Sequence, residues 1–261
     1  MGLMREFLRA LRPHSVIATG HAAGLQFVAK GADPQFLLGT YETPIQEALA
    51  SSLSEGDVFY DVGANVGFFS LIAARAVGSA GRAYAFEPVP QNVATIKRNV
   101  ELNGLNMVDI LPFAVGAACG EARLLLARHI GGAALESAGE PPDMRGAMTV
   151  TVVSLDDIVA ERQLRPPSVI KIDVEGAELD VLRGMPIILR EQRPMLIYEI
   201  DDATRQGLER KARDIADYLT SVYYTTLTLP ASYPDEVWNV RHVLAFPVER
   251  QPLANMAKGG N

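Results

Sequence analysis

Short apolar runs alternate with stretches of helical periodicity from Asp57 onward, and this alternation limits the chain to few folds. The apolar runs are nearly continuous, as expected of strands that are buried on both faces. Strands and helices in alternation predict an α/β fold, in which a mostly parallel sheet carries helices on both faces. We expect strands at 57–62, 82–87, 108–115, 168–174 and 194–200, and helices at 67–77, 91–104, 154–164, 176–185 and 203–222.

The length of 261 residues fits one large domain with appendages. We place the main domain at 46–250, behind an N-terminal helical cover at 1–45. The segment 127–148 is rich in glycine, alanine and proline, which predicts a mobile insertion. The tail at 251–261 is expected to be disordered. The cover and the insertion are expected to border a ligand crevice.

Charge and cysteine content bear on partners and compartment. The formal net charge of -7 argues against a nucleic-acid-binding protein, which usually has a basic face. The single cysteine, Cys119, cannot form an intrachain disulfide, so a reducing, cytoplasmic location is the simplest expectation. Arginines interrupt the apolar residues of 1–12, which argues against a signal peptide, and no run reaches the roughly 18 apolar residues of a membrane span. An apolar stripe in 1–12 is compatible with a homodimer.

The sequence YDVGANVGFFS (60–70) predicts a turn between a strand and a helix, where a ligand can approach the backbone. A nucleoside triphosphate site would need a lysine followed by serine or threonine after the second glycine, and Phe68 and Phe69 stand there instead. A dinucleotide site would need a glycine where Asn65 stands. A pyrophosphate would also be repelled by the nearby Asp61. These differences favour a ligand without phosphate groups.

Two carboxylates at neighbouring strand ends indicate the kind of ligand. Asp61 ends the first strand, where it could stabilise a positive amino or sulfonium group. Glu87 ends the second strand, where a carboxylate can accept hydrogen bonds from both ribose hydroxyls. S-Adenosylmethionine matches this pair, since it has an adenosine, a cationic sulfur and an amino-acid tail. The alternatives are that Asp61 only caps the helix behind it and that Glu87 lies on the surface.

The chain contains seven separated blocks: GTYETPIQEAL (39–49), FYDVGANVGFFSLIAA (59–74), AFEPVPQN (85–92), NVELNGL (99–105), AVG (114–116), SLDDIV (154–159) and IKIDVEGAELDVLRG (170–184). Together, in this order, they resemble the FkbM-type methyltransferases. The resemblance implies a Rossmann-like class I methyltransferase fold, with seven strands of which the last is antiparallel. The final two strands would be 221–229 and 239–247. It also implies methyl transfer from S-adenosylmethionine, usually to an oxygen of a natural product, sugar or lipid.

The resemblance also assigns residues of this chain to the methyl donor. Four residues of the glycine turn would lie at its methionine end: Asp61, Gly63, Asn65 and Gly67. Glu42 could close over the amino-acid tail of the donor.

Other assigned residues follow the later strands. Glu87, with Pro88 beside it, would bind the ribose, and Ala114 would lie near the adenine ring. Asp173 would lie at the reacting centre and also contact the donor. The segment 127–148 matches no block, so the resemblance says little about the acceptor.

Methyl transfer from a sulfonium depends on alignment more than on proton transfer. Holding two reactants in line supplies roughly 7–11 kcal/mol, whereas a general base adds about 10²–10⁴-fold. The candidate catalytic residues are Lys171 and Asp173 on one strand face, Glu199 at the end of the next strand, and His129 in the insertion. The alternative is an internal ion pair that only stiffens the crevice. We expect His242 to be solvent-exposed or structural.

Several alternatives stay open on chemistry and partner. The sequence has no clear metal signature, so we expect no metal, with a divalent ion shared by Asp173 and Glu199 as the alternative. The expected partner is a small-molecule acceptor that is methylated on a hydroxyl. The donor motifs do not report the acceptor atom, so N- or carboxyl methylation and a non-catalytic S-adenosylmethionine-binding module remain alternatives.

Overall fold

The computed structural model of the chain describes residues 15–28, 33–127, 133–138, 144–233 and 239–250. The expected disordered tail at 251–261 and the apolar stripe within 1–12 lie outside these residues.

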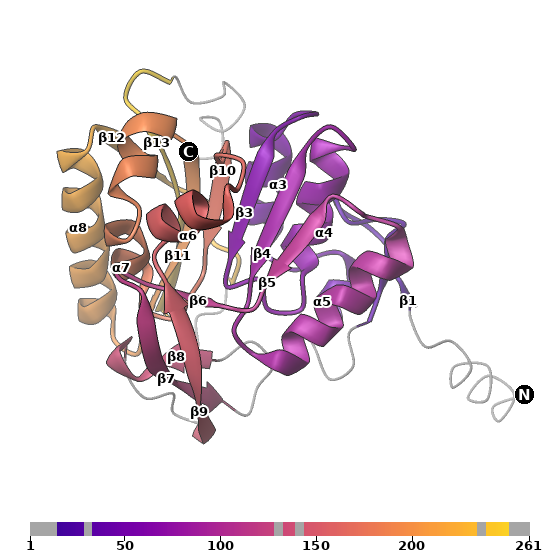
Figure 1. Cartoon of the computed structure of the whole chain (residues 1–261), viewed down its shortest axis with the longest axis horizontal. Helices are drawn as coiled ribbons and strands as arrows, with labels where there is room; N and C mark the ends of the chain where they lie inside the picture. Colours follow the sequence, from indigo (N-terminus) through magenta and orange to yellow (C-terminus); the bar gives the residue numbers. More distant parts are fainter. Residues whose placement is uncertain (1–14, 29–32, 128–132, 139–143, 234–238, 251–261) are drawn as a thin grey trace, which may run out of the picture.

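A seven-stranded mixed sheet forms the centre of the molecule (Figure 1). Its order is β12-β13-β11-β10-β3-β4-β5, and β13 is antiparallel to both of its neighbours. The other pairings are parallel, so the expectation of seven strands with an antiparallel last strand is confirmed. The strands are β3 (Val58–Val62), β4 (Arg82–Phe86), β5 (Val108–Leu111), β10 (Val169–Ile172), β11 (Met195–Asp202), β12 (Tyr224–Thr228) and β13 (Asn239–Pro247).

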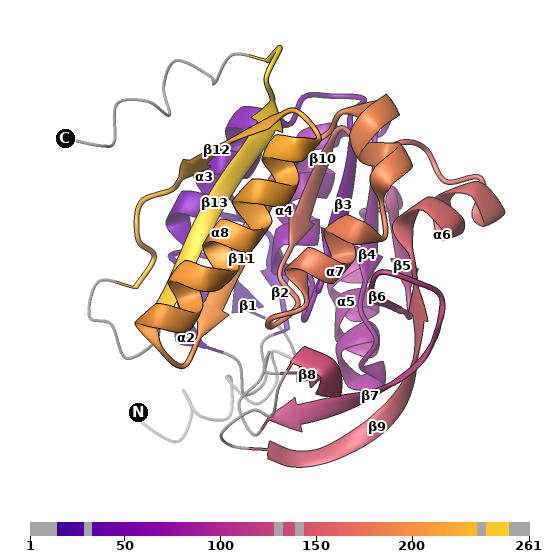
Figure 2. The same cartoon turned by 90° about the vertical axis from the view of Figure 1, so that its left-hand side faces the viewer.

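Helices cover both faces of this sheet, as the near-continuous apolar strands predict (Figure 2). On one face lie α3 (Thr43–Ser52), α4 (Phe68–Val77) and α5 (Pro90–Asn103), and on the other lie α6 (Leu155–Arg162), α7 (Glu178–Arg183), the π-helical turn η2 (Ile188–Gln192) and α8 (Arg205–Ser221). Side chains alternate along β3, so Phe59 packs into the first layer and Tyr60 into the second.

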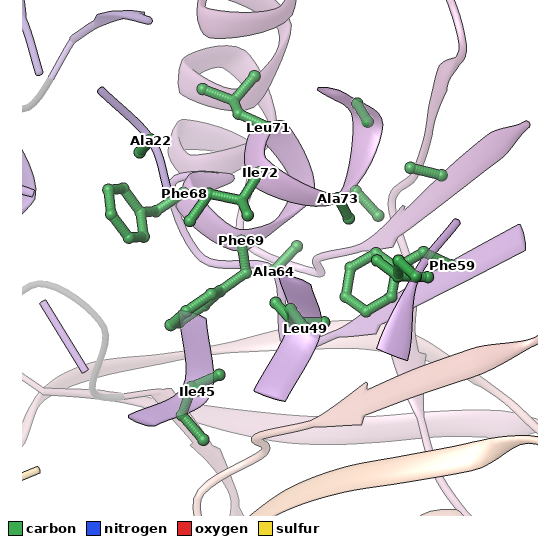
Figure 3. Close-up of a cluster of buried hydrophobic side chains, with 14 of the residues drawn as sticks. Ala22, Ile45, Leu49, Phe59, Ala64, Phe68, Phe69, Leu71, Ile72 and Ala73 are labelled. Carbon is green, nitrogen blue, oxygen red and sulfur yellow. The ribbon is translucent and has the colours of Figure 1, made fainter. Parts of the chain in front are cut away.

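The first layer contains the core that supports the glycine turn. In α4, eight of ten residues are buried, because this helix packs on β3 and β4 and also against α3 beside it. Figure 3 shows these side chains in one buried cluster, with the Phe69 ring of α4 directed toward Ile45 of α3 and Leu49 of α3 beside Phe59 of β3. The start of α4, and with it the end of the glycine turn, is therefore fixed by apolar packing.

The described part of the predicted helical cover at 1–45 is mostly not helical, so that prediction is wrong there. Residues 15–28 form a hairpin of β1 (Ser15–Val16) and β2 (Gln26–Phe27), followed by the short helix α2 (Pro34–Leu38) and the start of α3. The hairpin is held by side chains of α5: Asn103 exchanges two hydrogen bonds with the backbone of Gln26, at 2.8 and 2.7 Å. Its structure thus depends on contacts that are distant in sequence.

The segment predicted as a mobile insertion, 127–148, instead contributes to a second sheet in its described part. This sheet has the order β6-β9-β7-β8. Its elements are β6 (Ala114–Val115), β7 (Gly120–Ala127), β8 (Ala133–Leu135) with the 3₁₀ turn η1 (Glu136–Ala138), and β9 (Met144–Val153). Pairing between β7 and β9 supplies the order that the local composition does not suggest.

Two predicted strand boundaries need correction. The strand predicted at 108–115 ends at Leu111, because Pro112 has no N–H group with which to continue the ladder. The next strand residue, Ala114, belongs to the second sheet. At the other boundary, β11 continues past the predicted end at residue 200 to Asp202, since its pairing with β13 extends that far.

Among the described residues, the longest helix is α8, and none of the helices combines the length and apolar character needed to cross a bilayer.

Candidate active site

The sheet register brings the predicted polar residues to one place. Lys171 of β10 lies opposite Asp61 of β3, and Glu199 of β11 lies opposite His242 of β13. All four are near the carboxyl ends of the parallel strands, on the face covered by α3 and α4. Asp173 follows β10 on the same side as Lys171, as predicted from alternation.

The glycine turn joins β3 to α4 through three residues with positive φ. These are Gly63 (φ 79°), Asn65 (φ 50°) and Gly67 (φ 84°). A Cβ atom on Gly63 would overlap the carbonyl oxygen of Asp173, so no other residue fits there. Gly63 is therefore required by the neighbouring strand end, whatever ligand the turn binds. Asparagine tolerates the left-handed region better than most residues, which explains how Asn65 fits this turn.

Glu87 follows β4 and lies against the turn. Its two carboxylate oxygens accept hydrogen bonds from the backbone N–H groups of Asn65 and Val89, each at 2.8 Å. Only 4% of the residue is exposed, so the surface alternative is wrong. Burial raises the pKa of Glu87 to about 7, although the two backbone N–H groups oppose this rise. Pro88 beside it is half-buried.

Asp61 lies in the centre of the strand ends and is 1% exposed. Its Oδ2 accepts a hydrogen bond from Ser70 of α4 at 2.5 Å, and its Oδ1 lies 3.9 Å from Lys171 Nζ. Burial raises the pKa of Asp61, and Lys171 partly opposes this. Within the described part of the chain, Asp61 Oδ1 and Asn65 Oδ1 are both buried without a hydrogen-bond partner. Such oxygens are costly unless a ligand supplies donors.

Lys171 is 4% exposed and donates to Asp173 Oδ2 at 2.8 Å. Its ammonium group also lies 5.1 Å from the centre of the Phe69 ring. Burial lowers the pKa of Lys171, but Asp173, Asp61 and Glu42 together raise it more, so the pKa lies above its ordinary value. This upward shift favours the ammonium form of Lys171, in which it pairs with Asp173 and Asp61.

Glu42 enters the site from the N-terminus of α3, where its backbone is left-handed (φ 43°). It is 3% exposed, and its Oε1 accepts a hydrogen bond from the Tyr233 hydroxyl at 2.7 Å. Burial raises the pKa of Glu42, while His242 opposes this. Glu42 thus lies beside His242, and both line the same pocket; its expected contact with the donor stays a prediction.

His242 is the site residue that sequence reasoning missed. Its Nε2 lies 2.6 Å from Glu199 Oε2, and its Nδ1 lies 3.0 Å from Ser232 Oγ. Burial lowers the pKa of His242, and burial together with Asp173 and Glu42 raises that of Glu199 well above its ordinary value. His242 is buried, so the solvent-exposed alternative is wrong. A prediction that the strand containing His242 pairs with β11 in this register would have placed His242 opposite Glu199.

The remaining predicted residues have different outcomes. Ala114 is buried in β6, where it packs in the same apolar cluster as Val89, which follows Glu87 and Pro88. His129 lies outside the described residues, so its proposed role stays a prediction.

Two pockets meet at His242. One is a narrow recess on the α3 side without room for a water molecule, lined by Glu42, Lys171, Asp173 and Glu199, together with His242 and apolar neighbours. The other has a volume of about 180 Å³ and lies over the start of α8, where Ser232, Tyr233 and Arg241 contribute to its wall. His242 lines both, so it lies between the cavity on the α8 side and the buried carboxylates.

Comparison with known proteins places the sequence among methyltransferases. A family model described as the methyltransferase FkbM domain matches residues 61–225. The hexuronic acid methyltransferase AglP of Haloferax volcanii is 28% identical over 144 residues, which cover 55% of this chain and 56% of that protein. The 31-O-demethyl-FK506 methyltransferase FkbM of Streptomyces tacrolimicus is 30% identical over 159 residues, or 51% of this chain and 61% of that protein. The matches thus span less than two thirds of these relatives.

Solved structures agree on the fold. A methyltransferase FkbM from Methylobacillus flagellatus superposes with a TM-score of 0.53 at 18% identity, covering 84% of this chain and 56% of that one. A protein described as a putative rRNA methylase from Clostridium thermocellum gives a TM-score of 0.50 at 12% identity, covering 82% and 97%. The architecture is the Rossmann-like class I methyltransferase fold, with a mixed sheet.

Proposed function

This chain belongs to the FkbM methyltransferase family, and from that premise we propose that it transfers a methyl group from S-adenosylmethionine to a hydroxyl oxygen of a small molecule, such as a natural product or a sugar. The donor, the acceptor atom and the acceptor class are parts of this proposal. The family membership is its starting point.

One observation carries the choice of donor. Asp61 Oδ1 and Asn65 Oδ1 are buried acceptors without hydrogen-bond partners among the described residues, and both residues lie near Glu87 at the strand ends. A ligand that brings an ammonium group and ribose hydroxyls would supply hydrogen-bond donors to these three residues. A phosphate-bearing ligand would instead bring more acceptors and negative charge to a carboxylate-rich site.

S-Adenosylmethionine would supply a methyl group that is already activated on a sulfonium sulfur. The residues of this chain would bind and orient it. Asp61 and Asn65 would accept hydrogen bonds at its amino-acid end, and Glu87, with Pro88 beside it, would accept those of the ribose. Ala114, in the apolar cluster next to Val89, would border the adenine.

Alignment of acceptor and donor would provide most of the rate, roughly 7–11 kcal/mol. Removal of the hydroxyl proton would add about 10²–10⁴-fold. Asp173 or Glu199 would accept this proton; both line the same pocket as Lys171, which supports the assignment. Lys171, held as a cation, would keep Asp173 oriented and stabilise negative charge on the acceptor oxygen.

The names of two relatives support a small-molecule acceptor. One acts on a hexuronic acid and the other on 31-O-demethyl-FK506. A hexuronic acid has both hydroxyl and carboxyl groups, so carboxyl methylation is the alternative that a product analysis must distinguish from O-methylation of a hydroxyl.

The proposal predicts that the chain binds S-adenosylhomocysteine, the demethylated donor, through Glu87. Replacing Glu87 with glutamine removes one acceptor oxygen, so Glu87→Gln should weaken binding at least about tenfold, as loss of a hydrogen bond to a charged group does. Isothermal titration calorimetry measures this, with Glu101→Gln as the control, because Glu101 is exposed on α5.

Mass spectrometry of acceptor mixtures then tests turnover. A product heavier by one methylene equivalent and stable to mild alkaline hydrolysis supports a hydroxyl acceptor, whereas an alkali-labile product indicates a carboxyl ester. Binding without product from sugars, uronic acids or polyketides would favour a non-catalytic binding module. Absence of binding in the wild-type protein would end the proposal.

A further inference from the structure

We propose that Glu42, Glu199 and His242 form a binding site for one divalent transition-metal ion. The three residues come from different parts of the chain, namely the N-terminus of α3, strand β11 and strand β13. The inference stands on the arrangement of these side chains and does not require the proposed methyl transfer.

The geometry fits a single ion. Each residue offers one donor atom, and these atoms all lie within 4.8 Å of one another. His242 Nε2 is 2.6 Å from Glu199 Oε2 and 4.0 Å from Glu42 Oε2. Donor atoms about 2.0–2.2 Å from a common ion lie roughly 3.0–3.5 Å from one another. Small side-chain rotations would therefore bring all three around one ion.

The groups behind these donor atoms are arranged as in known metal sites. A histidine ligand is usually oriented by a hydrogen bond at its second ring nitrogen, and ligating carboxylates are themselves hydrogen-bonded. Here His242 Nδ1 contacts Ser232 Oγ at 3.0 Å, which leaves Nε2 facing the two glutamates. The Tyr233 hydroxyl donates to Glu42 Oε1 at 2.7 Å, which leaves Oε2 directed toward His242.

The charge around the site provides a separate argument. Among the described residues that line the pocket, Lys171 is the only lysine or arginine, whereas Glu42, Asp173 and Glu199 all line it. Asp61 adds a further carboxyl group, 3.9 Å from the Lys171 ammonium group. Lys171 makes its close contact with Asp173. A buried carboxyl group stays ionised only beside a cation, and a divalent ion between Glu42 and Glu199 would supply one.

The donor set indicates the class of ion. Magnesium and calcium favour oxygen ligands alone, whereas an imidazole with two carboxylates suits manganese, iron, cobalt or zinc. Three protein ligands leave coordination positions open. If the proposed function holds, an acceptor hydroxyl in such a position would lose its proton more readily, because a bound cation lowers the pKa of a coordinated hydroxyl group.

The site can be tested by metal binding alone. Metal-free, full-length protein is titrated with Mn²⁺, and electron paramagnetic resonance measures the free ion. We expect one tight site per chain, and at least about tenfold weaker binding in Glu42→Gln and in His242→Gln. His21→Gln is the matched control, because His21 and Glu47 form a similar pair on the surface, 3.2 Å apart.

Two further measurements keep the test decisive. Circular dichroism shows whether the variants remain folded, and Tyr233→Phe removes only the hydroxyl that supports Glu42, so it should weaken Mn²⁺ binding while leaving the fold intact. Wild-type protein that binds no Mn²⁺ or Co²⁺ would overturn the inference, as would folded His242→Gln that binds as tightly as wild type. Methyl transfer is assayed separately, so failure of the proposed function leaves this result readable.

Discussion

At the scale of one residue, Gly63 is required by the packing of the fold itself, independently of any ligand. The sequence suggested that this glycine lets a ligand approach the backbone. In the structure, the space that a side chain would fill is taken by the carbonyl oxygen of Asp173. The turn after β3 and the end of β10 are thus in direct contact, and this contact sets the position of both Asp61 and Asp173.

Gly63→Ala is therefore expected to lower the free energy of unfolding by about 4 kcal/mol or more, because it combines an unfavourable φ with a clash against backbone. Gly67→Ala should cost less, about 1–2 kcal/mol, since its Cβ would meet the Ile96 side chain at 3.1 Å, which can move. Urea unfolding of both variants measures the difference. Similar losses for the two would show that the Asp173 contact does not limit the turn.

At the scale of elements, α5 organises the N-terminal segment through asparagines spaced four residues apart. Asn99 is fully buried; its Oδ1 accepts from the Val28 N–H at 2.7 Å, and its Nδ2 donates to the Val66 carbonyl at 3.0 Å. Asn103 makes the matching bonds to Gln26. One helix therefore links the hairpin of residues 15–28 to the glycine turn, which explains a function of the block NVELNGL that the sequence alone left unassigned.

Removing this link should destabilise the protein. Asn99→Ala leaves the Val28 N–H and the Val66 carbonyl without partners, and we expect the free energy of unfolding to fall by about 3 kcal/mol. Asn106→Ala, at an exposed position just beyond α5, should change it by less than about 0.5 kcal/mol. Thermal and urea unfolding provide the measurement, and equal midpoints for the two variants would contradict the role assigned to Asn99.

At the scale of the whole molecule, buried acidic groups near the strand ends lower the free energy of unfolding when they ionise near neutral pH. The chain has a formal net charge of -7. Burial raises the pKa of Glu87 and of Glu178 from 4.5 to about 7. Both groups bind protons more tightly in the folded than in the unfolded chain, so their contribution to stability is fully present below 4.5 and is lost as pH rises through about 7.

The ligand-free protein should therefore melt at a higher temperature near pH 5 than near pH 7.5. Each of the two groups accounts for a difference of at most about 3 kcal/mol in the free energy of unfolding. Glu249, with a pKa lowered to about 2 by Arg193, does not titrate in this window. Glu178→Gln should reduce this pH dependence, because it removes one of the groups with a raised pKa. A melting temperature that rises steadily from pH 5 to pH 7.5 would contradict this expectation.

Much of the fold could be predicted because the pattern is local. The span of α5 and its end at Gly104 follow from a helical pattern and a glycine in the left-handed conformation, and the start of α6 follows from the Ser154 cap. The second sheet could not be predicted in this way, since β9 acquires its order from pairing with β7 rather than from its own composition.

The residues of the candidate site also differ in whether local sequence alone could locate them. Asp61 and Glu87 could be located from sequence, because each ends a recognisable strand. His242 could not be assigned to the site, because its place there depends on which strand lies beside β13 and in which register the two strands pair. Glu42 was noted for its position in a family block, but its contacts with Tyr233 and its proximity to His242 arise only when α3 packs over β11.

The sequence by itself determined the alternation of strands and helices, the glycine turn and the two carboxylates that follow β3 and β4, since periodicity, turn chemistry and strand ends are encoded within a few neighbouring residues. Tertiary structure alone decided that Glu42, Glu199 and His242 meet, and that Gly63 contacts Asp173. Their positions depend on strand order, register and helix packing, which bring together residues that are up to two hundred positions apart in the chain.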